Sequence, residues 1–163
     1  MWGLAAGEEA HRLMSDTGAI QSFAASSESL PALMDFIALR SSDLGVPRGT
    51  SLRLQLVAEE LFTNTFRHGV HRMQEEEAPQ PSVSVRLELA GQNVELTYED
   101  AELAWNPLDK LNPSHLQLPL AQRPVGGLGV VLIDSFAENV QYERVDQRNR
   151  VRVLMRFDPR EGL

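Results

Sequence analysis

The spacing of hydrophobic residues predicts helices in the first half of the chain. After a short apolar segment at 20–25, hydrophobic side chains recur at helical spacing across 30–44 and again across 50–66. Gly45 and Gly69 follow these two repeats, and glycine is a common residue just past a helix end. The pattern therefore predicts one short strand followed by two amphipathic helices.

The second half of the chain alternates polar and apolar residues in the manner of half-buried strands. The predicted elements are strands at 82–89, 93–99, 139–142 and 151–157 and a helix at 127–136, with a polar turn at 146–150 joining the last two strands. Gly91 lies in a tight turn between the first two strands, which indicates antiparallel pairing. The proline-containing stretch 101–123 has no sustained period and is predicted to be a long mobile loop. Together these elements predict an α+β fold, a two-layer arrangement of a mixed or antiparallel sheet covered on one face by helices.

Length and composition favour one soluble domain. The 163 residues include 42% hydrophobic and 23% charged residues and no apolar run approaching the roughly 20 needed to cross a bilayer. We expect a tail at 1–18, the domain at 19–158 and a short C-terminal tail at 159–163. A net charge of −8 disfavours direct binding to nucleic acid or an anionic membrane and favours a basic protein partner. With no cysteine and no secretory signal pattern, the expected location is the cytoplasm.

Three polar residues interrupt the second helix at steps of four. Glu60, Asn64 and His68 share one helix face, and burying them without partners would be costly, so this face is predicted to border a filled cleft. Asn64 can offer an oxygen to Mg²⁺, and Glu60 can accept a proton from a group attacking a phosphate. His68 fits a capping or supporting role better than direct ligation. The competing interpretation is a solvated helix face with ordinary salt bridges. A transition-metal site using His68 and His71 is disfavoured because no His-Glu-x-x-His arrangement exists.

A glycine-rich turn opens the predicted helix near 127. Gly126, Gly127, Leu128 and Gly129 precede apolar helical residues, and the free N–H groups at such a helix start attract phosphate. Plain helix entries also use glycine, and neither the Walker A pattern nor the dinucleotide fingerprint is matched.

Asp100, at the end of a predicted strand, could accept a hydrogen bond from an adenine amino group with Trp105 nearby, or could be an ordinary acidic turn.

Taken in order, these motifs resemble those of a known family, the bacterial anti-sigma-factor serine-protein kinases of the GHKL ATP-binding superfamily. The N box of that family, Glu-x-x-x-Asn-x-x-x-His-Gly, is similar at every named position to the segment from Glu60 to Gly69. Asp100, Trp105, Asn106 and Pro107 resemble its G1 box, residues 108–125 its ATP lid, and Gly126 to Gly129 its glycine box. The resemblance covers about 20–157.

The resemblance implies a protein-serine kinase that uses ATP and Mg²⁺ within a partner-switching module. By this resemblance Glu60 is the general base, Asn64 the Mg²⁺ ligand and Asp100 the residue that reads adenine, while His68, Trp105 and residues 126–129 contact the nucleotide. Arg123 in the lid is either a terminal-phosphate ligand or a surface arginine. The implied partners are a STAS-domain anti-sigma antagonist, a sigma factor or other regulator, and a second copy paired through the first sheet edge.

One residue departs from the family pattern, because Glu102 stands where the G1 box has glycine. If that glycine served a left-handed conformation, a side chain would cost roughly 1–2 kcal/mol. If it made room for the purine, Glu102 would add bulk and negative charge. The alternative is therefore a non-catalytic GHKL module with weakened ATP binding. A detached histidine-kinase catalytic domain is less expected, because no dimerisation helix is evident before Ile20.

Overall fold

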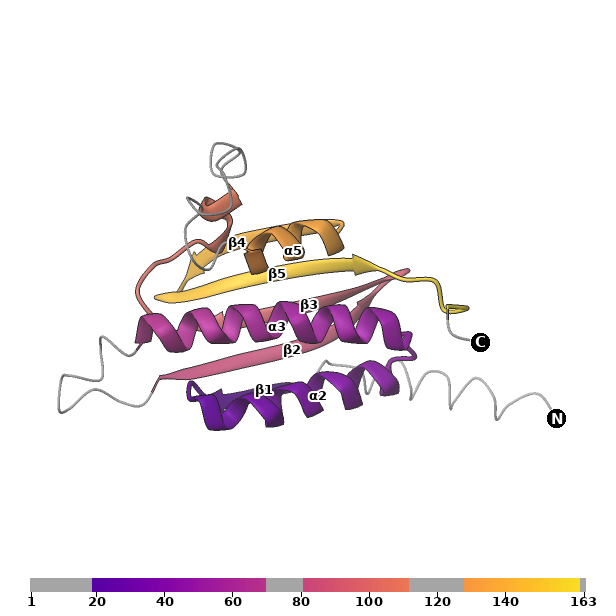
Figure 1. Cartoon of the computed structure of the whole chain (residues 1–163), viewed down its shortest axis with the longest axis horizontal. Coiled ribbons are helices and arrows are strands. Elements are labelled where there is room, and N and C mark those ends of the chain that lie inside the picture. The colour runs from indigo at the N-terminus through magenta and orange to yellow at the C-terminus, as the bar shows by residue number, and fades with distance from the viewer. Residues whose placement is uncertain (1–18, 70–80, 112–127, 162–163) are drawn as a thin grey trace.

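The computed structural model describes residues 19–69, 81–111 and 128–161. Its elements in chain order are β1 (Ile20–Ala24), the 3-10 helix η1 (Ser27–Ser29), α2 (Leu30–Asp43), α3 (Arg48–Gly69), β2 (Ser82–Ala90), β3 (Asn93–Asp100), the 3-10 helix η2 (Pro107–Leu111), α5 (Leu128–Phe136), β4 (Asn139–Val145) and β5 (Arg148–Arg156). The α+β prediction is confirmed (Figure 1). The predicted tail at 1–18 and much of the predicted lid lie outside the described residues. Within the described ranges, no helix has the length and apolar character to cross a membrane.

The strands form one antiparallel sheet in the order β1-β2-β3-β5-β4. Gly91 adopts a φ of +65° in the β2–β3 turn, a conformation that suits glycine. The β4–β5 turn contains only Asp146 and Gln147, both at positive φ. The prediction of a longer polar turn at 146–150 is wrong, because strand pairing continues up to this two-residue turn, as it does in tight hairpins.

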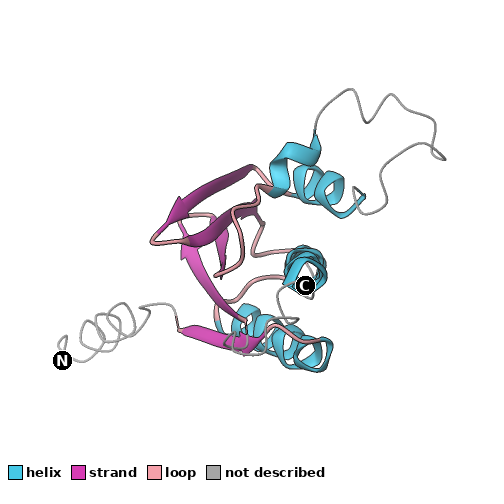
Figure 2. Cartoon of the chain, turned by 90° about the vertical axis from the view of Figure 1, so that its left-hand side faces the viewer, coloured by secondary structure: helices cyan, strands magenta, loops and turns pink. Residues whose placement is uncertain are grey.

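Within the described ranges, the helices α2, α3 and α5 cover the same face of the sheet, as Figure 2 shows. Alternate residues of the central strands point toward these helices and are fully buried, among them Val85 on β2, Leu96 on β3 and Val153 on β5. They meet Leu54 and Leu61 of α3 in one hydrophobic core. The predicted two-layer arrangement therefore follows from one apolar face on each strand meeting one apolar stripe on each helix.

The helix α3 lies between α2 and α5 in the helical layer (Figure 1). Different faces of α3 therefore meet the sheet and the two neighbouring helices. Leu61 and Thr65 are buried toward the core, and Glu60 and Asn64 each precede one of them by a single residue. One residue is a rotation of about 100° in a helix with 3.6 residues per turn. At its other end α3 is attached to α5 by Arg53, whose guanidinium lies 5.9 Å from the centre of the Phe136 ring.

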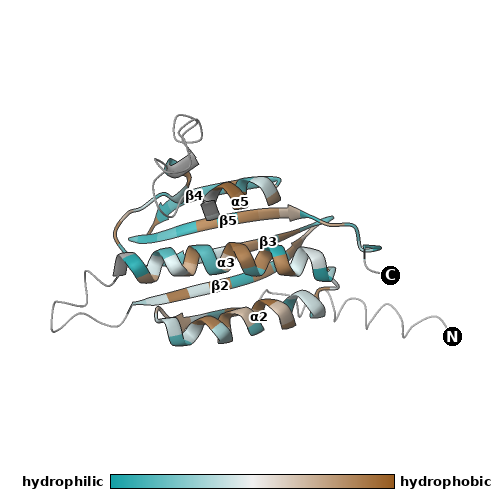
Figure 3. Ribbon diagram, in the orientation of Figure 1, coloured by the Kyte–Doolittle hydropathy of each residue, from teal (hydrophilic) through white to brown (hydrophobic). Residues whose placement is uncertain are grey.

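The polar ends of several elements meet at one end of the molecule. In Figure 1 the C-terminal end of α3, the end of β3, and the beginnings of β5 and α5 lie at the same end. Figure 3 shows the beginning of β5 as hydrophilic, whereas its later part is hydrophobic. This end of the fold brings together the residues that the sequence motifs single out.

Candidate nucleotide site

Glu60 and Asn64 contact each other on α3, as their spacing predicts. Asn64 Nδ2 donates a hydrogen bond to Glu60 Oε1 at 3.1 Å. Asn64 is only 3% exposed, while Glu60 is half-buried. Because the amide nitrogen faces Glu60, the Asn64 oxygen accepts no hydrogen bond from any described residue and stays available to a ligand. The interpretation of this face as a solvated salt-bridge surface does not hold for Asn64.

The beginning of α5 approaches Glu60 closely. A methyl group built on the Gly129 Cα would overlap the Cγ and Cδ atoms of Glu60. With Glu60 and α5 placed as they are, only glycine fits at position 129, and the constraint is steric because its φ is not positive. The structure thus brings together the helix that carries Glu60 and the helix that follows the glycine-rich turn.

The carboxylate of Asp100 is buried and accepts three hydrogen bonds. Thr65 Oγ1 lies 3.1 Å from Oδ2, while Asn149 Nδ2 at 2.7 Å and the Glu102 backbone N–H at 2.9 Å both donate to Oδ1. Asp100 is 5% exposed, so these donors replace the water it loses. Oδ2 has one described partner and retains a lone pair for a further donor, such as an exocyclic amine. Asp100 is thus a buried carboxylate, and its contact with the Glu102 N–H is also the local contact expected of an acidic turn after a strand.

Asn149 on β5 is a site residue that the sequence analysis missed. It is 2% exposed, and its Nδ2 donates to Asp100 Oδ1 and to the Leu103 carbonyl oxygen at 3.0 Å. The antiparallel register places Asn149 directly opposite Asp100. No motif signals this residue, because its role depends on the pairing of two strands that are distant in sequence.

The side-chain carbonyl oxygen of Asn149 accepts hydrogen bonds from three further donors. Oδ1 accepts hydrogen bonds from the Tyr142 hydroxyl at 2.9 Å, from Arg144 Nη1 at 2.8 Å and from the Trp105 backbone N–H at 3.3 Å. Arg144 Nη1 also donates to the Glu102 carbonyl oxygen at 2.6 Å. One buried amide therefore fixes both the end of β3 and the segment that leads from it to Trp105.

Tyr98 precedes Asp100 by two residues on β3, is buried on the same face of the strand, and stays protonated. Burial raises its pKa well above the ordinary value; a hydrogen bond with Thr65 lowers it, and the negative charges of Asp100 and Glu102 raise it again. The Tyr98 hydroxyl lies 2.8 Å from Thr65 Oγ1 and, being protonated, can donate to it. The Thr65 hydroxyl has one proton and two acceptors at 3.1 Å, Asp100 Oδ2 and the Leu61 carbonyl oxygen, so it can donate to either of them.

Glu102 is buried but not strained. Its relative exposure is 6%, and among the described non-glycine residues only Asp146 and Gln147 have positive φ. The expected cost of a left-handed conformation at Glu102 is therefore absent. The expectation of added negative charge remains, because the Glu102 carboxylate is close enough to contribute to the raised pKa of Tyr98.

The segment after Glu102 is held in a short turn. Trp105 is half-buried and tied to Asn149 through its backbone, and Asn106 Oδ1 accepts a hydrogen bond from the Leu108 N–H at 3.0 Å. This contact caps η2, a short helix within the predicted lid that the sequence did not suggest.

Several predicted site residues lie outside what the structure describes. Arg123, Gly126 and Gly127 fall in 112–127, beyond the described residues. His68 and Leu128 belong to α3 and α5, but their side chains are not among those described. Their predicted contacts with a nucleotide therefore stay predictions.

The donor set fits a magnesium nucleotide better than a protein-only metal centre. No group of three or more His, Asp or Glu side chains in the described ranges is arranged to hold a metal ion. Asn64 supplies one free amide oxygen, and Mg²⁺ typically combines one or two protein oxygens with phosphate oxygens and water. On the same part of α3, the side chain of Glu60 lies directly against the backbone of Gly129 at the beginning of α5.

Comparison with known proteins agrees with this geometry. A family model described as a histidine kinase-like ATPase domain matches residues 23–155. A comparison with curated proteins gave no match. The matched range contains every described site residue from Glu60 to Asn149.

We predict that Gly129→Ala destabilises the protein through Glu60. The added methyl group would force Glu60 or α5 to shift, and such overpacking lowers the free energy of unfolding by about 1–3 kcal/mol. In a Glu60→Ala background the obstacle is gone, so the same substitution should cost much less. Urea unfolding of the two single variants and the double variant measures this coupling.

Gly49→Ala is the matched control for this experiment. Gly49 lies in the first turn of α3, and a Cβ there meets no atom within 4 Å, so alanine should be neutral or slightly stabilising. Equal destabilisation by Gly129→Ala with and without the Glu60 side chain would contradict the contact.

Proposed function

Since the chain belongs to the family of histidine kinase-like ATPase domains, an ATP-binding domain of the GHKL type, we propose that it is an ATP-dependent protein-serine kinase of a partner-switching module. Its proposed substrate is a serine on a STAS-type antagonist, and its second partner is a sigma factor or a related regulator that it sequesters. The observation that supports this best is the pairing of Glu60 with Asn64 on the side of α3 that meets Gly129 at the beginning of α5.

Adenine recognition is the proposed role of the buried carboxylate. Asp100 is ionisable, oriented by Thr65, Asn149 and the Glu102 N–H, and has one lone pair of Oδ2 to spare. A carboxylate held in this way accepts from an amino group without having to reorganise, which is the preorganisation that favours binding.

Phosphoryl transfer depends mainly on positioning and charge neutralisation. Bound Mg-ATP supplies the transferable phosphoryl group and the divalent charge that neutralises it. Asn64 would hold the ion through its free oxygen, and Glu60 would accept the proton of the substrate serine. The hydrogen bond from Asn64 Nδ2 to Glu60 Oε1 orients the carboxylate toward the beginning of α5.

The kinase proposal is tested by phosphate transfer from γ-labelled ATP to a STAS-domain protein of the same organism. We expect Glu60→Ala to lower transfer by about 100-fold or more while nucleotide binding persists, because a general base typically contributes 10²–10⁴-fold. Asn64→Ala should weaken Mg²⁺-dependent binding. Glu59→Ala removes an exposed carboxylate one residue away and should leave transfer unchanged. Absence of transfer by the wild type while it holds nucleotide would refute the proposal.

A second candidate function has an observation in its favour. The Glu102 carboxylate adds negative charge beside Asp100, which opposes a polyanionic ligand. A chain that binds no nucleotide would act as a partner-binding module without catalysis. Replacing Glu102 with glycine and recovering nucleotide binding would support that candidate over the kinase.

We also propose that two copies associate along β1. This strand is at one edge of the sheet, and Ile20 at its start is 65% exposed. Unpaired backbone groups of an edge strand can pair with a second copy by extending the sheet. Sedimentation equilibrium should show a dimer, and a monomer at high protein concentration would exclude this arrangement.

A further inference from the structure

The face of the sheet away from the helices carries a row of arginines. Residues that alternate with the buried core positions point to this outer face. Its arginines are Arg86, Arg148, Arg150, Arg152 and Arg156, and its glutamates are Glu88, Glu95, Glu99 and Glu143. The two signs nearly balance here, whereas the whole chain has a net charge of −8. The outer face is therefore much less negative than the rest of the protein.

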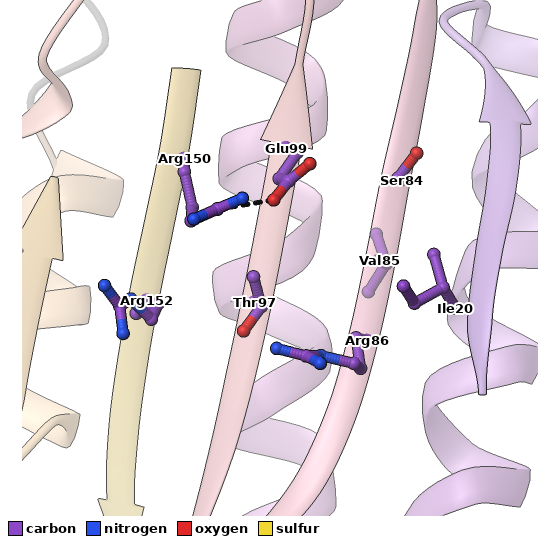
Figure 4. Close-up of a pocket in the computed structure, with 8 residues that line it drawn as sticks. All are labelled: Ile20, Ser84, Val85, Arg86, Thr97, Glu99, Arg150 and Arg152. Carbon is purple, nitrogen blue, oxygen red and sulfur yellow. Dashed lines mark hydrogen bonds and ion pairs between the residues drawn. The ribbon is translucent and has the colours of Figure 1, made fainter. Parts of the chain in front are cut away.

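Two of these arginines flank one buried threonine. Arg86 on β2 and Arg152 on β5 are the cross-strand neighbours of Thr97 on β3. They border a hollow of about 190 Å³ that Ser84, Thr97 and the ion-paired residues Glu99 and Arg150 also line, so three arginines face one glutamate there. Figure 4 shows Arg86 extending from β2 across to Thr97, with Arg152 on the other side of that residue. Strands lie about 4.8 Å apart, so the two arginine backbones are separated by about 10 Å.

The arginines of this face differ in the number of ion pairs that they form with glutamates. Arg150 contacts both Glu99 and Glu143. Arg152 pairs through Nη2 with Glu143 at 2.7 Å, but its Nε is buried and has no hydrogen-bond partner among the described residues.

Arg86, which borders the same hollow, also has donors to spare. Its one ion pair within the described ranges runs from Nε to Glu88 at 3.1 Å. The two Nη groups of Arg86 and Nη1 of Arg152 have no ion pair among the described residues, so donors other than the buried Nε remain on both sides of Thr97.

The available donors fit a carboxylate. Arginine presents a planar fork of donors that matches a carboxylate, and the Ser84 and Thr97 hydroxyls add short-range donors. A long polyanion such as nucleic acid would feel the overall negative charge, whereas a short acidic segment interacts mainly within a Debye length of about 8–10 Å. A second copy would bring this face's arginines together with its glutamates, which are already paired with them, and so would lack the net negative charge that an acidic segment supplies.

We propose that Arg86, Thr97 and Arg152 form a docking site for an acidic segment of a protein partner, on the opposite side of the sheet from the nucleotide site. The site does not depend on the proposed kinase activity, because its residues point away from α3 and α5 (Figure 4). It gives the protein two separate surfaces, one facing the nucleotide and one facing a partner.

Fluorescence anisotropy with a labelled oligoglutamate peptide at about 50 mM salt tests the docking site. We expect saturable binding that the double variant Arg86→Ala/Arg152→Ala weakens by about fivefold or more, because two partly exposed ion pairs are lost. An uncharged oligoglutamine peptide should not bind. Nucleotide binding by the double variant should equal that of the wild type, which also shows that it is folded.

The matched control removes the same charge elsewhere. Arg48 is exposed at the start of α3 and Arg160 is 85% exposed near the C-terminus, so Arg48→Ala/Arg160→Ala should bind the peptide as the wild type does. Equal weakening by both double variants, or no binding to the wild type, would overturn the proposal. So would an RNA oligonucleotide that binds the same row more tightly than the peptide, or a dimer that only Arg86→Ala/Arg152→Ala dissociates.

Discussion

The hydrogen bond between Asn149 and Asp100 is the contact on which the nucleotide site depends. Both residues are buried at the same register position of neighbouring strands, where a carboxylate without donors would be unstable. Leaving one such group unpaired costs about 1–3 kcal/mol, more when it is charged. The same amide holds the segment from Leu103 to Trp105 through two further bonds. The orientation of Asp100 and the course of the chain after β3 are therefore set together.

A second constraint links the phosphate side of the site to the fold. The absence of a side chain at Gly129 allows α5 to pack against Glu60, while Arg53 and Phe136 join the same two helices at the other end. Glu60 is thus positioned from both sides, by Asn64 within α3 and by the backbone of Gly129 on α5. Asp100 and Glu60 lie on different elements, yet each is held by a contact to a neighbour distant in sequence.

Much of this arrangement could be predicted from local sequence, and the remainder could not for identifiable reasons. Hydrophobic periodicity predicted the helices and strands, and the four-residue spacing predicted the contact between Glu60 and Asn64. The extent of β5 was underestimated because Arg148, Asn149 and Arg150 look like turn residues, although strand pairing begins at once after Gln147. The role of Asn149 could not be predicted from the sequence, because its partners Asp100 and Tyr142 lie on other strands. The strain expected at Glu102 came from analogy with a glycine and is absent, since the backbone there has no positive φ.

The central claim is that the buried Asn149–Asp100 contact prepares the site for a purine nucleotide. Calorimetric titration of Mg-ATP into the wild type and Asn149→Ala tests it directly, with Asn139→Ala as a control that removes an exposed amide from β4. The account predicts micromolar binding to the wild type and the control, and binding at least about tenfold weaker for Asn149→Ala, equivalent to about 1.4 kcal/mol. Equal affinity of a folded Asn149→Ala protein and the wild type would contradict it.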